Sequence, residues 1–222
     1  TISQSNAQWV QTGNIDGCTP TCFARFSGGI LCGSYGGLYE SIDEGQSWQL
    51  SGYFLNSMII GIVAKADTIT VCYAGRTGSS FSDSSFCKTS FDGGFTWSNP
   101  VYVTENYGAV SIHKFGEFLL INTSEEFFRS YDNGLNWSQV SLPQGQFSFG
   151  IRVFGKYALI YSTDMAQTYY NYICDTSLIF QRIDINNNIN GEVMIDTLIF
   201  GYKITSPEHA DVFKSSDLGQ TW

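Results

Sequence analysis

The sequence predicts an all-β protein, a β-propeller of about five four-stranded blades, and two observations lead to this prediction. An octapeptide recurs along the 222 residues with a period in the low forties, and short alternating apolar patterns lie between its copies. A period of about 40 to 50 residues without a helical pattern is typical of a propeller blade. We therefore expect residues 1–222 to form a single propeller domain.

Four segments share the pattern S-x-D-x-G-x-[STN]-W, which we call the octapeptide motif. Its shared residues are Ser41, Asp43, Gly45 and Trp48; Ser90, Asp92, Gly94 and Trp97; Ser130, Asp132, Gly134 and Trp137; and Ser215, Asp217, Gly219 and Trp222. Aspartate at a turn accepts hydrogen bonds from backbone N–H groups, glycine supplies a positive φ, and tryptophan buries a large apolar surface. These residues therefore have structural roles, and we expect none of them to be catalytic.

A fifth, diverged copy is expected between the third and the fourth, because their aspartates are 85 residues apart. The segment Cys174–Phe180 keeps Asp175 and the aromatic Phe180 at the motif offsets, with Ser177 in place of glycine. With this copy included, successive aspartates are separated by 49, 40, 43 and 42 residues. The chain is therefore expected to contain five repeats.

The octapeptide motif resembles the Asp-box, or BNR, repeat of sialidases, sortilin-type receptors, some glycoside hydrolases and several lectins. This resemblance implies a propeller fold in which the repeats are structural. It does not extend to the sialidase active site, because the chain has no Arg-Ile-Pro element and its five arginines lie at non-equivalent positions. We therefore expect no sialidase activity.

Alternating apolar residues between the motifs predict further strands, which we name A to D within each repeat. In the third repeat, strands are expected over 109–115, 118–121, 126–131 and 137–142. Two-residue turns between strands A and B are expected at 116–117, 155–156 and 196–197. The recurrence of this turn at one place in successive repeats supports antiparallel hairpins.

The two ends of the sequence predict how the ring closes. Trp222 stands where a strand D would begin, and Gln8–Gly13 resembles such a strand without a motif before it. We expect this N-terminal strand to pair into the last blade, which would remove two exposed strand edges. The alternative is that the chain is a piece of a larger propeller.

The six cysteines point to an oxidising environment. Pairing counted outward from a predicted loop at Gly75–Ser84 puts Cys72 opposite Cys87, so we expect a disulfide between them. Cys18 and Cys22 could bridge locally, and Cys32 and Cys174 have no evident partner. An extracellular location is therefore expected.

Charge and composition argue against several functions. The formal net charge is −9, with 20 acidic and 11 basic residues, and a surface for nucleic acid needs a basic patch. No apolar run reaches the roughly 18 residues of a membrane span. With no C-x-x-C pair and two scattered histidines, we expect no metal site and no cofactor. We therefore expect no nucleic-acid partner and no membrane insertion.

We expect a non-enzymatic recognition module that binds a glycan or a protein, extracellular or displayed on a cell or virion surface. Function should lie opposite the motifs, in the B–C loops and the D–A connections, because loops on a rigid scaffold commonly carry binding residues. The candidate ligand-binding residues there are Tyr35, Tyr53, Arg76, Tyr107, Tyr169, Tyr170 and His209.

Two alternatives remain open at the level of sequence. A glycoside hydrolase-like enzyme would need two carboxylates facing each other across a cleft. Acidic residues on predicted loops that could supply them are Glu105, Glu125, Glu126, Asp164 and Glu208. The second alternative is a scaffold subunit packed inside a larger complex.

Overall fold

The computed structural model describes residues 13–15, 18–77, 80–104, 108–123, 126–143, 147–163, 169–183, 190–195, 198–206 and 209–222. Within these ranges the chain is all-β apart from one short 3-10 helix, η1 (Gly52–Phe54). The strands pair into five antiparallel sheets, each built from strands that are consecutive in the sequence. The predicted all-β class is therefore confirmed.

The sheets are numbered here in chain order. Sheet 1 contains β1 (Pro20–Phe26), β2 (Gly29–Ser34), β3 (Leu38–Ser41) and β4 (Gln49–Leu50); sheet 2 contains β5 (Ser57–Lys65), β6 (Thr68–Thr77), β7 (Ser80–Ser90) and β8 (Val101–Thr104); sheet 3 contains β9 (Ala109–Phe115), β10 (Phe118–Thr123), β11 (Phe127–Ser130) and β12 (Ser138–Val140). Sheet 4 contains β13 (Phe147–Phe154), β14 (Tyr157–Thr163), β15 (Tyr169–Asp175) and β16 (Gln181–Ile183), and sheet 5 contains β17 (Asn190–Ile195), β18 (Leu198–Ser206) and β19 (His209–Ser215).

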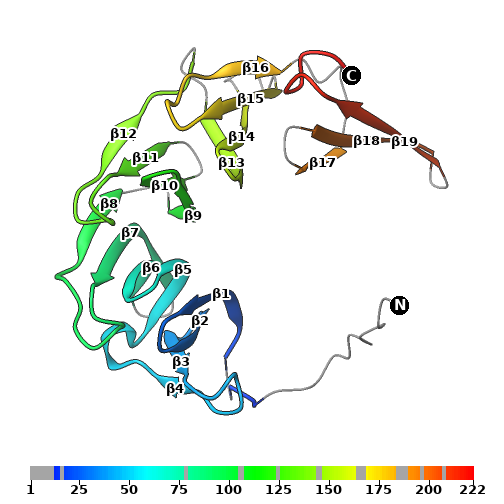
Figure 1. Ribbon diagram of the computed structural model, residues 1–222. Helices are drawn as coiled ribbons and strands as arrows, with labels where there is room; N and C mark the ends of the chain where they lie inside the picture. Colours follow the sequence, from blue (N-terminus) through cyan, green and yellow to red (C-terminus); the bar gives the residue numbers. More distant parts are fainter. Residues whose placement is uncertain are drawn as a thin grey trace.

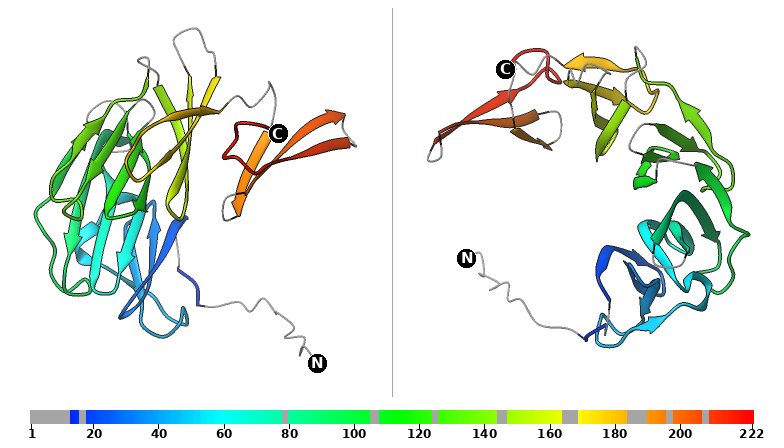
Figure 2. Two further views of the ribbon diagram at one scale, coloured as in Figure 1. Left: turned by 45° about the horizontal axis from the view of Figure 1, so that its top comes forward. Right: turned by 180° about the vertical axis from the view of Figure 1, so that it is seen from behind.

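The five sheets follow one another around an arc, with sheet 1 and sheet 5 at its two ends (Figure 1). In the middle three sheets the first strand lies towards the inside of the arc and the last strand towards the outside, which the view from behind also shows (Figure 2). This is the arrangement of a five-bladed β-propeller, as predicted. Sheet 5 has three strands in the described part of the chain, and residues 8–12 lie outside that part, so ring closure stays a prediction.

The predicted A–B hairpins are confirmed by the strand register. Phe115 pairs with Phe118 and Phe154 with Tyr157, so each turn has two residues, and Gly116 and Gly155 adopt φ of 56° and 57°. Such positive φ values are those that two-residue hairpin turns require. The turn predicted at 196–197 lies outside the described residues, although the flanking pair Ile195 and Leu198 has the same register.

Two predicted loops are wrong. The ladder between β6 and β7 continues to the pair Thr77 and Ser80, so most of Gly75–Ser84 is strand. In the same way, the B–C loop that was expected to carry His209 is largely strand, because β18 extends to Ser206 and β19 begins at His209. Both segments are rich in polar residues that are typical of a loop, but the ladder is made by backbone groups, and serine and threonine side chains do not interrupt it.

The hydrophobic core lies between neighbouring sheets as four clusters of buried side chains. Ile59 and Ile69 help to fill the space between sheets 1 and 2, and Phe115 with Ile160 that between sheets 3 and 4. Among the described side chains, Leu159, Ile173, Ile183 and Ile199 form the cluster between sheets 4 and 5.

Candidate functional site

The octapeptide turn of sheet 1 uses both oxygens of its aspartate. The Ser41 hydroxyl donates to Asp43 Oδ1 at 2.8 Å and accepts the Gly45 N–H at 2.8 Å. Asp43 Oδ1 also accepts the Ser47 N–H at 2.8 Å, and Asp43 Oδ2 accepts the Ser47 hydroxyl at 2.6 Å. Both oxygens of the carboxylate therefore accept hydrogen bonds from residues of its own turn.

The same set of hydrogen bonds recurs in the turns of sheets 2, 3 and 5. The residues that make it are Ser90, Asp92, Gly94 and Thr96; Ser130, Asp132, Gly134 and Asn136; and Ser215, Asp217, Gly219 and Thr221. Hydrogen bonds to a carboxylate stabilise its ionised form. Hydrogen bonds from three groups lower the pKa of Asp43, Asp92 and Asp217 to about 2. The largest effect comes from the side chain of the seventh motif residue, followed by the N–H of that residue and then by the hydroxyl of the motif serine.

Asp132 follows the same rule in a more buried place. Burial alone would raise its pKa, but hydrogen bonds from the Asn136 and Ser130 side chains outweigh this and lower the pKa. All four carboxylates are therefore charged near neutral pH, and each has both oxygens bound within its turn.

The aromatic residue at the eighth motif position packs towards the preceding sheet. Trp97 lies against the cluster between sheets 1 and 2, Trp137 against that between sheets 2 and 3, and Phe180 against that between sheets 3 and 4. Trp222 packs likewise between sheets 4 and 5, and its buried indole N–H has no partner among the described residues. The turns therefore connect consecutive blades.

The diverged turn of sheet 4 is built differently. Ile173 replaces the motif serine and Ile179 replaces the seventh-position donor, so the two side chains that bind the carboxylate elsewhere are absent. Asp175 Oδ1 instead accepts both the N–H and the hydroxyl of Ser177. The positive φ moves to Leu178, at 57°, whose N–H donates to the Asp175 carbonyl oxygen at 3.0 Å.

This change leaves one carboxylate oxygen of Asp175, Oδ2, without a hydrogen-bond donor among the described residues. The pKa of Asp175 is lowered, chiefly by the hydrogen bond from the Ser177 hydroxyl, so the group is ionised near neutral pH. Among the described residues, no side chain or N–H donates to Asp175 Oδ2, whereas the hydroxyl or amide of the seventh residue does so in each intact turn. Asp175 is therefore the one motif aspartate with a carboxylate oxygen that accepts no hydrogen bond from the described residues.

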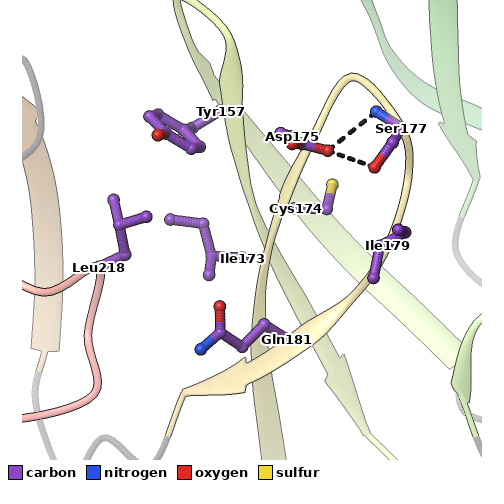
Figure 3. A pocket seen from close by; sticks show the side chains of 8 residues that line it. All are labelled: Tyr157, Ile173, Cys174, Asp175, Ser177, Ile179, Gln181 and Leu218. Atoms are coloured by element: carbon purple, nitrogen blue, oxygen red, sulfur yellow. Dashed lines mark hydrogen bonds between the residues drawn. The ribbon is translucent and has the colours of Figure 1, made fainter.

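This carboxylate lines a cavity of about 300 Å³ between sheet 4 and the octapeptide turn of sheet 5 (Figure 3). Its walls are Tyr157, Ile173, Cys174, Asp175, Ser177, Ile179, Gln181 and, from sheet 5, Leu218. Burial raises the pKa of Cys174 to about 12, so its thiol is neutral. The cavity therefore combines one ionised carboxylate with neutral polar groups and aliphatic side chains, a composition suited to binding.

The predicted ligand-binding residues lie elsewhere. Tyr35 is in the β2–β3 loop, as expected, and 46% exposed, but it does not line the cavity. Tyr53 lies in η1, and its hydroxyl donates to the carbonyl oxygen of Phe95 at 3.0 Å in the octapeptide turn of sheet 2. This D–A connection therefore reaches a motif turn rather than an opposite face.

The remaining candidates are less informative. Arg76, Tyr169 and Tyr170, predicted on loops, lie in β6 and β15, and Tyr107 lies outside the described residues. His209, also predicted on a loop, begins β19 and is exposed. The cavity was missed because it arises from residues that the diverged motif lacks, and the isoleucines at 173 and 179 were the available signal.

Cys72 and Cys87 face each other on neighbouring strands, but no disulfide joins them. Cys72 lies directly opposite Cys87, as predicted, but all six cysteines are free thiols in the structure, so the expected disulfide is not confirmed. Burial is the main cause that raises the pKa of Cys87 well above its ordinary value. Burial is also the main cause that raises the pKa of Cys32 to about 12, and the neighbouring Cys18 and Cys22 add to this shift.

The described ranges give no sign of a metal site or of a membrane-spanning helix. They contain no group of three or more His, Cys, Asp or Glu side chains that could hold a metal ion. No helix in the described part of the chain is long and apolar enough to cross a membrane.

No protein-family model matches the chain, and no curated protein matches it. Among solved structures, an ancestral GH74 enzyme is similar over 92% of this chain and 33% of its own, at 16% identity and a TM-score of 0.67. The GH74 enzyme of Niastella koreensis is similar over 87% of this chain and 36% of its own, at 14% identity and a TM-score of 0.56. Human WBSCR16 is similar over 90% of this chain and 63% of its own, at 9% identity and a TM-score of 0.54.

These likenesses concern the fold and agree with a β-propeller. The chain spans about a third of the length of the two GH74 enzymes. At such low identities, nothing about their activity passes to this chain.

Proposed function

We propose that the chain is a non-enzymatic recognition module that binds a protein partner, and that its octapeptide motifs are Asp boxes. The observation that carries the proposal is the cavity at the diverged fourth turn. There a repeat has lost the internal hydrogen bonds of the other four, and a charged acceptor borders aliphatic side chains instead. A repeat that no longer satisfies its own aspartate presents that group to another molecule.

A protein partner agrees with the cavity lining better than a glycan does. Three of the lining residues, Ile173, Ile179 and Leu218, are aliphatic, and Tyr157 is the single aromatic one. Sugar rings commonly stack on an open aromatic face, but Lys156 Nζ lies 5.1 Å from the centroid of the Tyr157 ring. An aliphatic wall with one carboxylate is better matched to a peptide side chain.

The non-enzymatic assignment is likewise a proposal. Glycoside hydrolysis uses two carboxyl groups about 5 to 10 Å apart, and among the described residues that line the cavity Asp175 is the single carboxylate. Of the acidic loop residues considered above, Glu126 is described and accepts a hydrogen bond from Gln139 at 3.0 Å, while the other four lie outside the described residues. The extracellular or surface setting is proposed on the cysteine content alone.

Selection of peptides against the purified chain tests the proposal. A displayed library of random 12-residue peptides would be selected on the wild-type chain and counter-selected on Gln181→Trp, which places a large side chain at the cavity wall. We expect enriched peptides whose affinity for Gln181→Trp is about tenfold lower, a difference of about 1.4 kcal/mol. Binding on a glycan array without any enriched peptide would point to a glycan ligand, and turnover of aryl glycosides would overturn the non-enzymatic assignment.

A further inference from the structure

We propose that Asp175 Oδ2 receives the cationic head of a lysine or arginine side chain of the partner. This inference rests on the proposed function, because it names the chemistry that the cavity at the diverged turn accepts. Asp175 is the one motif aspartate whose hydrogen bonds differ from those of its four counterparts.

The fourth repeat lacks the side-chain donor that binds the second carboxylate oxygen in the other repeats. Asp43 Oδ2 accepts the Ser47 hydroxyl at 2.6 Å, and the seventh motif residue makes the equivalent bond in the other intact turns. Ile179 occupies that position in the fourth repeat and has no donor. Asp175 Oδ2 therefore accepts no hydrogen bond from the described residues, whereas Oδ2 of each of the other four carboxylates already accepts one.

The carboxylate of Asp175 is held in place by Ser177. The Ser177 N–H donates to Asp175 Oδ1 at 2.9 Å, and the Ser177 hydroxyl donates to the same oxygen. A carboxylate fixed through one oxygen presents the other in a defined direction, so little conformational freedom is lost when a donor binds. Hydrogen bonds between an ionised acceptor and a cationic donor are also stronger than neutral ones.

The cavity has an apolar wall. Ile173, Ile179 and Leu218 line the cavity beside the carboxylate, and Ile179 is 74% exposed. Lysine and arginine carry aliphatic stems that cover apolar surface while the charged head binds a polar group. The stem of a guest side chain would lie along these residues as its head reaches Asp175.

Lys156 is a positive charge close to Asp175. Lys156 lowers the pKa of Asp175 through its charge, yet its ammonium lies over the Tyr157 ring and makes no ion pair with Asp175. A guest cation would therefore be attracted by the carboxylate and repelled by Lys156. This gives a test with a defined sign, because removal of Lys156 should strengthen the binding of a cation and weaken that of an anion.

The test is a titration followed by NMR of ¹³C-labelled isoleucine δ1 methyl groups. The probes are Nα-acetyl-lysine amide and Nα-acetyl-arginine amide, with Nα-acetyl-glutamate amide and methyl glucoside as controls. We expect saturable shifts at Ile173 and Ile179 with the two cationic probes, and none at Ile59 or Ile121, which are buried in other clusters. Saturable shifts with the glutamate or glucoside probe alone would overturn the inference.

Three variants test whether the carboxylate of Asp175 binds the cation. Asp175→Asn should weaken the cationic probes about tenfold, since the ionised acceptor is lost. Ile179→Thr restores the donor that Thr96 and Thr221 supply in other turns, so it should occupy Oδ2 and weaken binding by a similar factor. Lys156→Ala should strengthen binding about two- to fivefold.

Ile42→Thr is the matched control, because Ile42 is exposed to 77% on the intact turn of sheet 1, close to the 74% of Ile179. It should leave the titration unchanged. If selected peptides bind the wild-type chain but Asp175→Asn does not weaken them, the inference is wrong while the proposed function stands. If the cationic probes bind as expected and no peptide is ever selected, the proposed function fails and the cation site remains.

Discussion

The hydroxyl of Thr70 in sheet 2 donates a hydrogen bond to the carbonyl oxygen of Asn133, 2.9 Å away in the octapeptide turn of sheet 3. Thr89, beside Thr70 on the neighbouring strand, donates to the same oxygen at 2.5 Å. A motif turn is therefore bound by the blade that precedes it, through polar contacts as well as through its aromatic residue.

Thr70→Val should lower the free energy of unfolding by about 1 kcal/mol, because Thr70 is 2% exposed and loses a buried hydrogen bond without a change of shape. Urea denaturation measures the difference. Thr19→Val, at an exposed threonine, is the control and should change the value by less than about 0.5 kcal/mol. Equal losses in the two variants would contradict the role given to Thr70.

Asp92→Asn should flatten the acid dependence of stability. The Thr96 hydroxyl holds the pKa of Asp92 at about 2 in the folded chain, below its ordinary value of 3.8. The stabilisation from the ionised group is therefore complete above about pH 4 and is lost as the pH falls towards 2. Urea denaturation between pH 5 and pH 2 should show a smaller decline for Asp92→Asn than for the wild type, and parallel curves would refute this.

His113→Gln should remove a stability loss that begins as the pH falls below 6.5. Burial lowers the pKa of His113 below 6.5, and its Nε2 lies 2.8 Å from the Ser111 hydroxyl, which also donates to Asn122 Oδ1. Stability is therefore complete above pH 6.5, and it falls as the pH drops through the folded-state pKa. Thermal melts from pH 7.5 to pH 5 should fall less steeply for the variant, whereas identical slopes would rule out His113 as the source.

Thiol labelling of the native chain should begin at Cys18 and Cys22, which are partly exposed, and spare the four buried cysteines. Burial raises the pKa of Cys32 and Cys174 to about 12, and a neutral thiol is a poor nucleophile. Mass spectrometry after timed iodoacetamide treatment gives the order. Early loss of Cys72 or Cys87 would contradict this packing, and a non-reduced Cys72–Cys87 peptide would establish the disulfide predicted from sequence.

Removal of residues 1–12 tests ring closure. Sheet 5 ends at β19 with a partner on one side among the described strands, and the Gly13 N–H donates to the Gly45 carbonyl oxygen at 2.8 Å. If the removed segment pairs with β19, a loss of about 2 kcal/mol should lower the melting temperature by about 4 to 8 °C. An unchanged melting temperature would mean that this segment does not close the ring.

Much of the fold could be predicted from the sequence because the repeats are local. The hairpins at Gly116 and Gly155 follow from turn chemistry, and the register of Cys72 with Cys87 follows from counting pairs outward from the predicted B–C connection. The extension of the β6–β7 ladder to Thr77 and Ser80 was missed because the polar residues of this segment are typical of a loop, although backbone groups make the pairing.

The candidate site was harder to predict for a different physical reason. One wall of its cavity is Leu218, which comes from the next sheet. The free oxygen of Asp175 results from Ile173 and Ile179, which have no side-chain donor where the other motifs have one. The motif was recognised from the residues that match it, and the effect of the two isoleucines on the hydrogen bonds of Asp175 was therefore not predicted. Tyr53, chosen from its predicted loop, is engaged instead by Phe95 in a neighbouring turn.

The carboxylate of Asp175 has one oxygen bound to Ser177 and one without a partner in the described chain, so folding depends on half of the group. Substitutions around the second oxygen can therefore alter what is bound with little effect on stability, whereas the same substitutions at Asp43 would disturb the turn itself. In an array of near-identical units, the fourth one is where selection could diversify specificity while the other units keep the scaffold intact.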